Sequence, residues 1–198
     1  MSSKAHFNPK STKWLISLAV MIVLCVGVIF GSSALYNLVN GKYTEHHEIP
    51  FSIASTEEID ISSYAQASAL TGVTSVEKAL DSSGNTVAYI VTGTTVGYNT
   101  EVPIEMSTTV SADGTLICGI DIIKQKETEY LGVKVATNEF KSQFEGRLIP
   151  VVSSKDTAKG SKIDVISGST ISSQAVVDGV SNAVEFLSRA KLIEVAEQ

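Results

Sequence analysis

Hydroxyl and small side chains gather in one stretch near the C-terminus, and their types and spacing suit chemistry better than any other part of the chain. The stretch is Asp164-Val165-Ile166-Ser167-Gly168-Ser169-Thr170-Ile171-Ser172-Ser173. Apolar residues then recur at helical spacing, which predicts an amphipathic helix over 172–187. A helix N-terminus presents unpaired N–H groups and the positive end of the helix dipole, and both favour a phosphate. The stretch indicates either a phosphate-bearing ligand or side chains that simply cap the helix.

The same stretch resembles the flavinylation motif in the FMN-binding domains of the RnfG and NqrC subunits. That motif has an aspartate, two further residues and then Ser-Gly-Ala-Thr, and a dedicated flavin transferase joins the phosphate of FMN to its threonine as a phosphoester. Thr170 matches the threonine, whereas Ser169 stands where alanine is usual. The resemblance implies FMN bound covalently to Thr170, with Ser167, Gly168 and Ser169 beside the phosphate and Asp164 as a contact for the transferase. Ser169 adds a second hydroxyl beside Thr170, which makes it the alternative acceptor.

Three other segments resemble the same family, in the family's order along the chain. Residues 97–103 resemble a Gly-Tyr loop near the flavin, which makes Tyr98 a candidate cofactor contact. Residues 126–132 resemble a Glu-Thr-Pro-Gly-Leu-Gly loop that packs on the flavin, and residues 140–146 resemble a block with an aromatic residue, Gln-Phe and a glycine. The resemblance therefore extends over about half of the chain.

The loop at 126–132 supplies most of the remaining candidate contacts. Its residues that match the family are Glu127, Thr128, Leu131 and Gly132. The resemblance implies that the isoalloxazine ring rests on this loop, with an apolar contact from Leu131 and a hydrogen bond to Thr128. Tyr130 is one of two residues that replace Pro-Gly, and we interpret it as packed in the core rather than stacked on the ring.

The N-terminal region has the pattern of a membrane anchor. All three basic residues of the first forty precede Trp14, and the uncharged, mostly apolar run after them exceeds the ~20 residues that cross a bilayer. A cleavable signal peptide is the alternative, but its apolar part is usually only about 7 to 15 residues. The positive-inside rule then places the N-terminus in the cytoplasm. We expect a cytoplasmic N-terminus over 1–13, a transmembrane helix over 14–38, a juxtamembrane linker over 39–54, an extracytoplasmic domain over 55–190 and a C-terminal tail over 191–198.

Composition excludes several functions for the exterior domain. Of 15 basic residues, 12 remain after the three N-terminal lysines are set aside, against 21 acidic ones, which gives the exterior part a formal charge of −9. This charge argues against nucleic acid and anionic lipid as partners. No histidine follows His47, so the domain has no imidazole base for a nucleophile, and its single cysteine, Cys118, forms no metal-binding cluster. We interpret His46 and His47 as solvated, and the chemistry must then come from a cofactor.

Turn and strand signals predict the fold class α+β, with a mostly antiparallel sheet and packed helices after the membrane anchor. Two hairpins are expected, because alternating or apolar runs flank short stretches rich in Asp, Ser and Gly. The expected elements are strands over 73–80, 86–92, 102–110, 115–123 and 147–152, helices over 55–70 and 138–144, and a polar loop over 153–162.

These expectations combine into an electron-transfer subunit. The resemblance implies a redox subunit, without independent catalysis, of a cell-membrane complex that couples ferredoxin:NAD oxidoreduction to Na⁺ or H⁺ translocation. The implied partners are RnfA, RnfB, RnfC, RnfD and RnfE, together with a flavin transferase for maturation. The alternatives are another anchored, flavinylated electron carrier outside the cytoplasm and a cofactor-free anchored sensor or binding module.

Overall fold

The structure is a computed structural model that describes residues 45–194 of the 198. The expected cytoplasmic N-terminus and transmembrane helix lie outside the described residues. Among residues 45–194, no helix is both long and apolar enough to cross a membrane.

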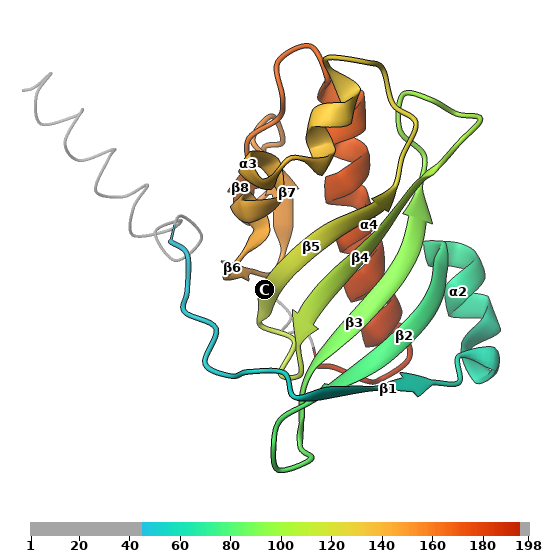
Figure 1. The fold of residues 1–198 in the computed structure, drawn as a ribbon, viewed down its shortest axis with the longest axis vertical. Helices are drawn as coiled ribbons and strands as arrows, with labels where there is room; N and C mark the ends of the chain where they lie inside the picture. The colour runs from blue at the N-terminus through green and yellow to red at the C-terminus, as the bar shows by residue number, and fades with distance from the viewer. Residues whose placement is uncertain (1–44, 195–198) are drawn as a thin grey trace, which may run out of the picture. The chain divides into compact units, whose positions relative to one another are not determined.

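An antiparallel meander forms the centre of the described domain, as the sequence predicts. Its strands are hydrogen-bonded in chain order, each to the next. Figure 1 shows this sheet with the long C-terminal helix crossing one of its faces. The strands are β1 (Ser55–Ile59), β2 (Val73–Leu80), β3 (Thr86–Thr95), β4 (Ile104–Ser111), β5 (Leu116–Lys124) and β6 (Arg147–Leu148).

The first half of the predicted helix over 55–70 is wrong. Residues Ser55–Ile59 pair with β2 in antiparallel register, with Ser55 opposite Leu80, and the helical residues are a 3₁₀ turn, η2 (Ser62–Tyr64), and α2 (Ala65–Thr71). Because β1 is an edge strand, its first four residues are exposed, and its acidic side chains resemble the first turn of a helix.

Both predicted hairpins are confirmed, with strand ends that differ by a few residues. Alternate residues of β4 are buried, as the pattern predicts, and these are Ile104, Met106, Thr108 and Val110. The return strand β5 is less buried than expected, because Ile117 is its only fully buried residue. Cys118 is half-buried there. Burial, and to a smaller extent the negative charge of nearby Asp113, raises the pKa of its thiol to about 11.

Helix α4 (Thr170–Arg189) begins two residues before the predicted start and covers the sheet. Its predicted apolar stripe is buried, and the stripe consists of Val176, Val180, Ala183 and Leu187. At Gly179 the helix approaches the sheet closely, because a β-carbon there would lie 2.5 Å from the sulfur of Met106. This close packing holds the middle of α4 against β3 and β4.

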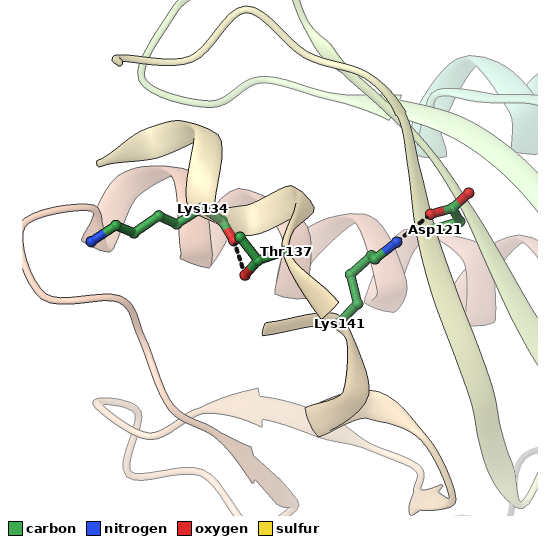
Figure 2. A network of polar contacts seen from close by, with 4 residues as sticks. All are labelled: Asp121, Lys134, Thr137 and Lys141. Carbon is green, nitrogen blue, oxygen red and sulfur yellow. Dashed lines mark hydrogen bonds and ion pairs between the residues drawn. The ribbon is translucent and has the colours of Figure 1, made fainter. Parts of the chain in front are cut away.

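A short helical segment follows β5 and is attached to that strand. It comprises η3 (Gly132–Ala136), α3 (Asn138–Lys141) and η4 (Ser142–Phe144), which confirms the predicted helix over 138–144. Figure 2 shows Lys141 reaching Asp121 of β5, at an Nζ to Oδ1 distance of 2.7 Å, and Thr137 donating its hydroxyl to the carbonyl of Lys134. Lys141 thereby ties the segment to the sheet.

The predicted strand over 147–152 divides between two sheets. Its first part is β6, which pairs with β5, and its second part is β7 (Val151–Ser153), after a cis Ile149–Pro150 peptide bond. Strand β7 pairs in parallel with β8 (Ser161–Ile163), which the sequence analysis assigned to a polar loop. Three residues of β8 were too few to give a recognisable alternation.

Candidate functional site

Three loops and the N-terminus of α4 meet at one end of the domain. The loops are those after β3, after β5 and after β8, which Figure 1 shows together at the top of the view. They enclose a cleft of about 390 Å³. The residues that line it are Tyr98, Thr128, Leu131, Gly168, Ser169, Thr170, Ile171 and Ser172. Segments that lie far apart in the sequence thus form one site.

Neighbouring hydroxyls of the motif occupy different environments. Ser169 is the N-cap residue of α4, but its side chain makes no capping hydrogen bond. Its Oγ is buried and has no hydrogen-bond partner in the described part of the chain. Thr170 is the first helical residue, is partly exposed, and accepts a hydrogen bond at Oγ1 from Nζ of Lys155 at 3.0 Å. Both residues line the cleft, but the Ser169 hydroxyl is buried, whereas Thr170 is partly exposed.

The turn before α4 is closed by Ser173. Its Oγ donates to the carbonyl of Ser169 at 2.8 Å and accepts from the N–H of Ile166 at 3.1 Å. The turn needs Gly168, whose φ of +79° lies in the left-handed region that favours glycine. The first part of the hydroxyl motif is therefore held on the first turn of the helix by a buried serine.

Glu127, in the loop after β5, connects this loop to the loop after β3 and to the start of α4. Its carboxylate is 5% exposed and accepts the backbone N–H groups of Tyr98, at 3.1 Å, and Asn99, at 3.2 Å. Ser172 donates to the same carboxylate at 2.6 Å. Hydrogen bonds to the ionised form compensate for burial of a charge. Glu127 thus fixes the loop of Tyr98 to the start of α4.

A second link holds the beginning of the motif. The side-chain amide of Gln143 accepts from the N–H of Asp164 at 2.8 Å and donates to the carbonyl of Asp164 at 3.3 Å. The Asp164 side chain remains exposed. The segment 140–146 therefore contributes to the site through the backbone of the motif.

The structure brings together most of the residues that the sequence analysis proposed. Tyr98, Thr128, Leu131, Gly168, Ser169 and Thr170 line the cleft. Glu127 and Gly132 are buried next to each other below it, and Ser167 is exposed on the turn. Glu127 is placed as a support for the loops, with its carboxylate occupied by the protein itself.

The interpretation of Tyr130 as a packed core residue is wrong. Its side chain is 83% exposed, and its backbone has a φ of +64°. The family resemblance has a glycine at this position, and Tyr130 adopts the left-handed conformation that glycine favours. The loop therefore keeps a glycine-like turn, which directs the tyrosine ring into solvent.

Sequence reasoning missed two residues, one that contacts Thr170 and one that lines the cleft. Lys155 contacts Thr170 from the turn after β7, fifteen positions earlier in the chain, and no motif includes it. Ile171 is 56% exposed on the cleft wall, although an isoleucine in a helix usually indicates a core position. The only signal for Ile171 was that it lies off the apolar stripe of α4.

Comparison with known proteins agrees with this site. Residues 97–185 match the FMN-binding domain family. This segment, which contains the cleft and most of α4, is similar to that family, and the resemblance predicted from the motifs is confirmed.

Curated relatives give a more specific comparison. Over 111 residues the chain is 41% identical to the G subunit of the ion-translocating oxidoreductase complex of Methanosarcina acetivorans. Over 109 residues it is 44% identical to the G subunit of the Na(+)-translocating ferredoxin:NAD(+) oxidoreductase complex of Acetobacterium woodii. The alignments cover 56% and 52% of this chain, and 57% and 51% of the respective relatives. The chain thus spans about half the length of the curated relatives it matches.

A solved structure is similar in fold. The C subunit of the Na(+)-translocating NADH-quinone reductase from Parabacteroides distasonis superposes with a TM-score of 0.51 at 21% sequence identity. The superposition covers 69% of this chain and 77% of that chain. The shared feature is the mostly antiparallel sheet with packed helices.

Proposed function

We propose that the chain is an electron-transfer subunit that carries FMN esterified through its phosphate to Thr170. The observation that carries this proposal is the position of Thr170, which lines the cleft at the N-terminus of α4 and is partly exposed. The backbone N–H groups of the first helical turn and the positive end of the helix dipole favour a phosphate there. When bound, FMN supplies one-electron and two-electron transfer.

The residues around the cleft fit this cofactor. The cleft volume lies within the roughly 300 to 1,000 Å³ of small-molecule sites, and its walls combine apolar side chains with a few polar ones. Thr170 and the turn at Gly168 would hold the phosphate, while Leu131, Tyr98 and Ile171 offer apolar surface for the ring. Thr128 offers a hydroxyl for a hydrogen bond.

Accessibility favours Thr170 over Ser169 as the point of attachment. The Ser169 hydroxyl is buried, whereas that of Thr170 is partly exposed and lies beside a cation. Attachment requires an activated donor, a phosphoanhydride of FMN. The bond between Oγ1 and phosphorus forms, the anhydride P–O bond breaks, and the hydroxyl proton and the second phosphate group depart. A covalent bond would prevent loss of the flavin by dilution outside the cytoplasm.

The wider assignment rests on the two relatives, which are G subunits of ion-translocating oxidoreductase complexes, one of them a ferredoxin:NAD(+) oxidoreductase. In this proposal an N-terminal helix anchors the chain in the cell membrane, and the domain lies on the extracytoplasmic side. The chain then works with the other Rnf-type subunits, and a flavin transferase matures it. The domain passes electrons and catalyses no reaction of its own.

Mass spectrometry of the intact chain tests the attachment. After coexpression with a flavin transferase, the wild-type mass should exceed that of the bare chain by one FMN less water, and Thr170→Ala should abolish the increment. Thr157→Ala is the matched control, because it removes an exposed threonine hydroxyl outside the motif and should keep the increment. A wild-type chain without the increment, or an increment that survives in Thr170→Ala, contradicts the proposal.

A further inference from the structure

A lysine that belongs to none of the recognised motifs is held against Thr170. Lys155 lies in the turn that joins β7 to β8, and its Nζ donates to Oγ1 of Thr170 at 3.0 Å. The turn is braced internally, because the N–H of Asp156 donates to the carbonyl of Ser153 at 2.9 Å. Lys162 also donates through Nζ to two carbonyls of the same turn, those of Asp156 and Ala158. The position of Lys155 therefore follows from an ordered turn.

The position is electrostatically unfavourable in the bare chain. Lys155 lies at the positive end of the α4 dipole, where cations are destabilising and anions are stabilising. Among residues 45–194 the side-chain ion pairs found join Lys141 to Asp121 and Arg189 to Glu185, and neither includes Lys155. The side-chain partner of Lys155 is the neutral hydroxyl of Thr170. If a phosphate is attached to that hydroxyl, the cation gains an anionic partner, which would explain its position.

We propose that Lys155 is a positioning residue of the attachment site, an inference that rests on the proposed function. Before attachment, its ammonium holds Oγ1 of Thr170 in a fixed orientation through the hydrogen bond from Nζ. After attachment, the same ammonium pairs with the negative charge of the phosphodiester formed at Oγ1. A charge-assisted hydrogen bond of this kind is stronger than the bond to a neutral hydroxyl. Lys155 thus favours both the transfer and the loaded state.

The first experiment measures the rate of flavin attachment. The purified full chain is incubated with a flavin transferase and its donor, and the fraction with the FMN mass increment is followed with time. Lys155→Met should slow attachment about tenfold or more, as expected when one charge-assisted hydrogen bond is lost. Lys155→Arg keeps the charge and should recover most of the rate. Lys159→Met is the matched control, since Lys159 is an exposed lysine of the same turn with no such contact, and its rate should equal that of wild type.

The second experiment separates this role from a purely structural one. Melting temperatures are compared for bare and fully loaded chains. In the bare chain, Lys155→Met should leave the melting temperature unchanged or raise it, because a cation is removed from the positive end of α4. In the loaded chain the same substitution should lower it by about 2 to 4 °C, because the phosphodiester loses its counter-charge. High salt should reduce the second difference.

Three results would overturn the inference. Wild-type attachment rates in Lys155→Met together with an unchanged melting temperature in the loaded chain would show that Lys155 has no role, while the proposed function would stand. An equal loss of melting temperature in bare and loaded chains would make Lys155 a structural residue. A wild-type chain that acquires no increment would reject both the proposed function and this inference.

Discussion

At the scale of single residues, the site shows that burial decides what a hydroxyl can do. Ser169 and Thr170 are adjacent and chemically similar, yet the Oγ of Ser169 is buried without a partner among residues 45–194, whereas Thr170 is partly exposed and its Oγ1 accepts from Lys155. Ser173 is also buried, but it makes two hydrogen bonds that close the turn. Removing the hydroxyl should therefore change the free energy of unfolding differently at each of these positions.

Replacing Ser169 with alanine should stabilise the protein. A buried hydroxyl without a partner costs roughly 1–3 kcal/mol, and this N-cap side chain makes no capping bond that could be lost. We expect Ser169→Ala to raise the free energy of unfolding by about 1 kcal/mol in denaturant titrations. Ser173→Ala, which removes a bonded hydroxyl, should lower it by a similar amount. A loss of stability in Ser169→Ala would show that its hydroxyl is paired.

At Tyr130, which adopts a left-handed conformation, we expect a glycine variant to be more stable than an alanine variant, the reverse of the usual order. At a positive φ, a residue with a β-carbon is strained by about 1–2 kcal/mol, and glycine is not. Because the ring is 83% exposed, little packing is lost on substitution. Tyr130→Gly should therefore be more stable than Tyr130→Ala by about 1 kcal/mol, measured by chemical denaturation. The opposite order would mean that residue 130 does not adopt this conformation.

At the scale of elements, the start of α4 connects the loops that form the cleft. Glu127 receives Ser172 from the helix and the N–H groups of Tyr98 and Asn99 from the loop after β3. The cleft therefore depends on a contact between segments 45 positions apart in the chain. Local stability of the loop and of the helix start should be coupled.

Removing the Ser172 hydroxyl tests this coupling. Ser172→Ala should lower the free energy of unfolding by about 1–3 kcal/mol, because the buried carboxylate of Glu127 loses a donor. Hydrogen exchange at the amides of Tyr98 and Asn99 should become faster. Ser181→Ala on the exposed side of the same helix is the control and should change neither property. Unaltered exchange at Tyr98 in Ser172→Ala would show that the loop does not depend on the link.

The turn between β4 and β5 should respond to acid. Burial alone would raise the pKa of Asp113, but hydrogen bonds from Ser111 and Thr115 outweigh it and hold that pKa below the ordinary 3.8. A carboxylate with a lowered pKa contributes stability above its unfolded pKa and loses it as the pH falls through the folded value. Asp113→Asn should thus destabilise at pH 7 and differ less from wild type near pH 2, as measured by thermal melts.

At the scale of the whole molecule, a rigid sheet and one long helix carry a site made of loops. The loops that line the cleft all lie at the end of the domain where α4 begins. The chain after residue 40 is acidic, whereas the first forty residues carry three lysines and no acid. This asymmetry favours an N-terminus in the cytoplasm and a domain on the other side of the membrane.

Limited proteolysis tests this topology. Trypsin added to intact cells, with the outer membrane permeabilised where one exists, should cleave the exposed turn that contains Lys155 and Lys159. A cytoplasmic protein in the same cells should remain intact. Protection of the turn until the cells are lysed would place the domain in the cytoplasm.

The sequence by itself determined the fold class, the two hairpins, the C-terminal helix and the family. Each of these depends on local information, namely the alternation of β4, the turn residues before β5, the helical spacing in α4 and the contiguous motif around Thr170. The exposed edge strand β1 carried no such alternation, so its acidic residues predicted a helix instead. Strand β8 was too short to be recognised.

Only the tertiary structure decided which side chains share the cleft. The contact of Lys155 with Thr170, the support of the Tyr98 loop by Glu127 and the clamp of Gln143 on Asp164 all join residues distant in sequence. Burial of the Ser169 hydroxyl and exposure of Thr170 also depend on how the turn packs on its neighbours. Such differences arise from long-range packing, which places chemically equal neighbours in unequal environments and leaves no periodic signal in the sequence.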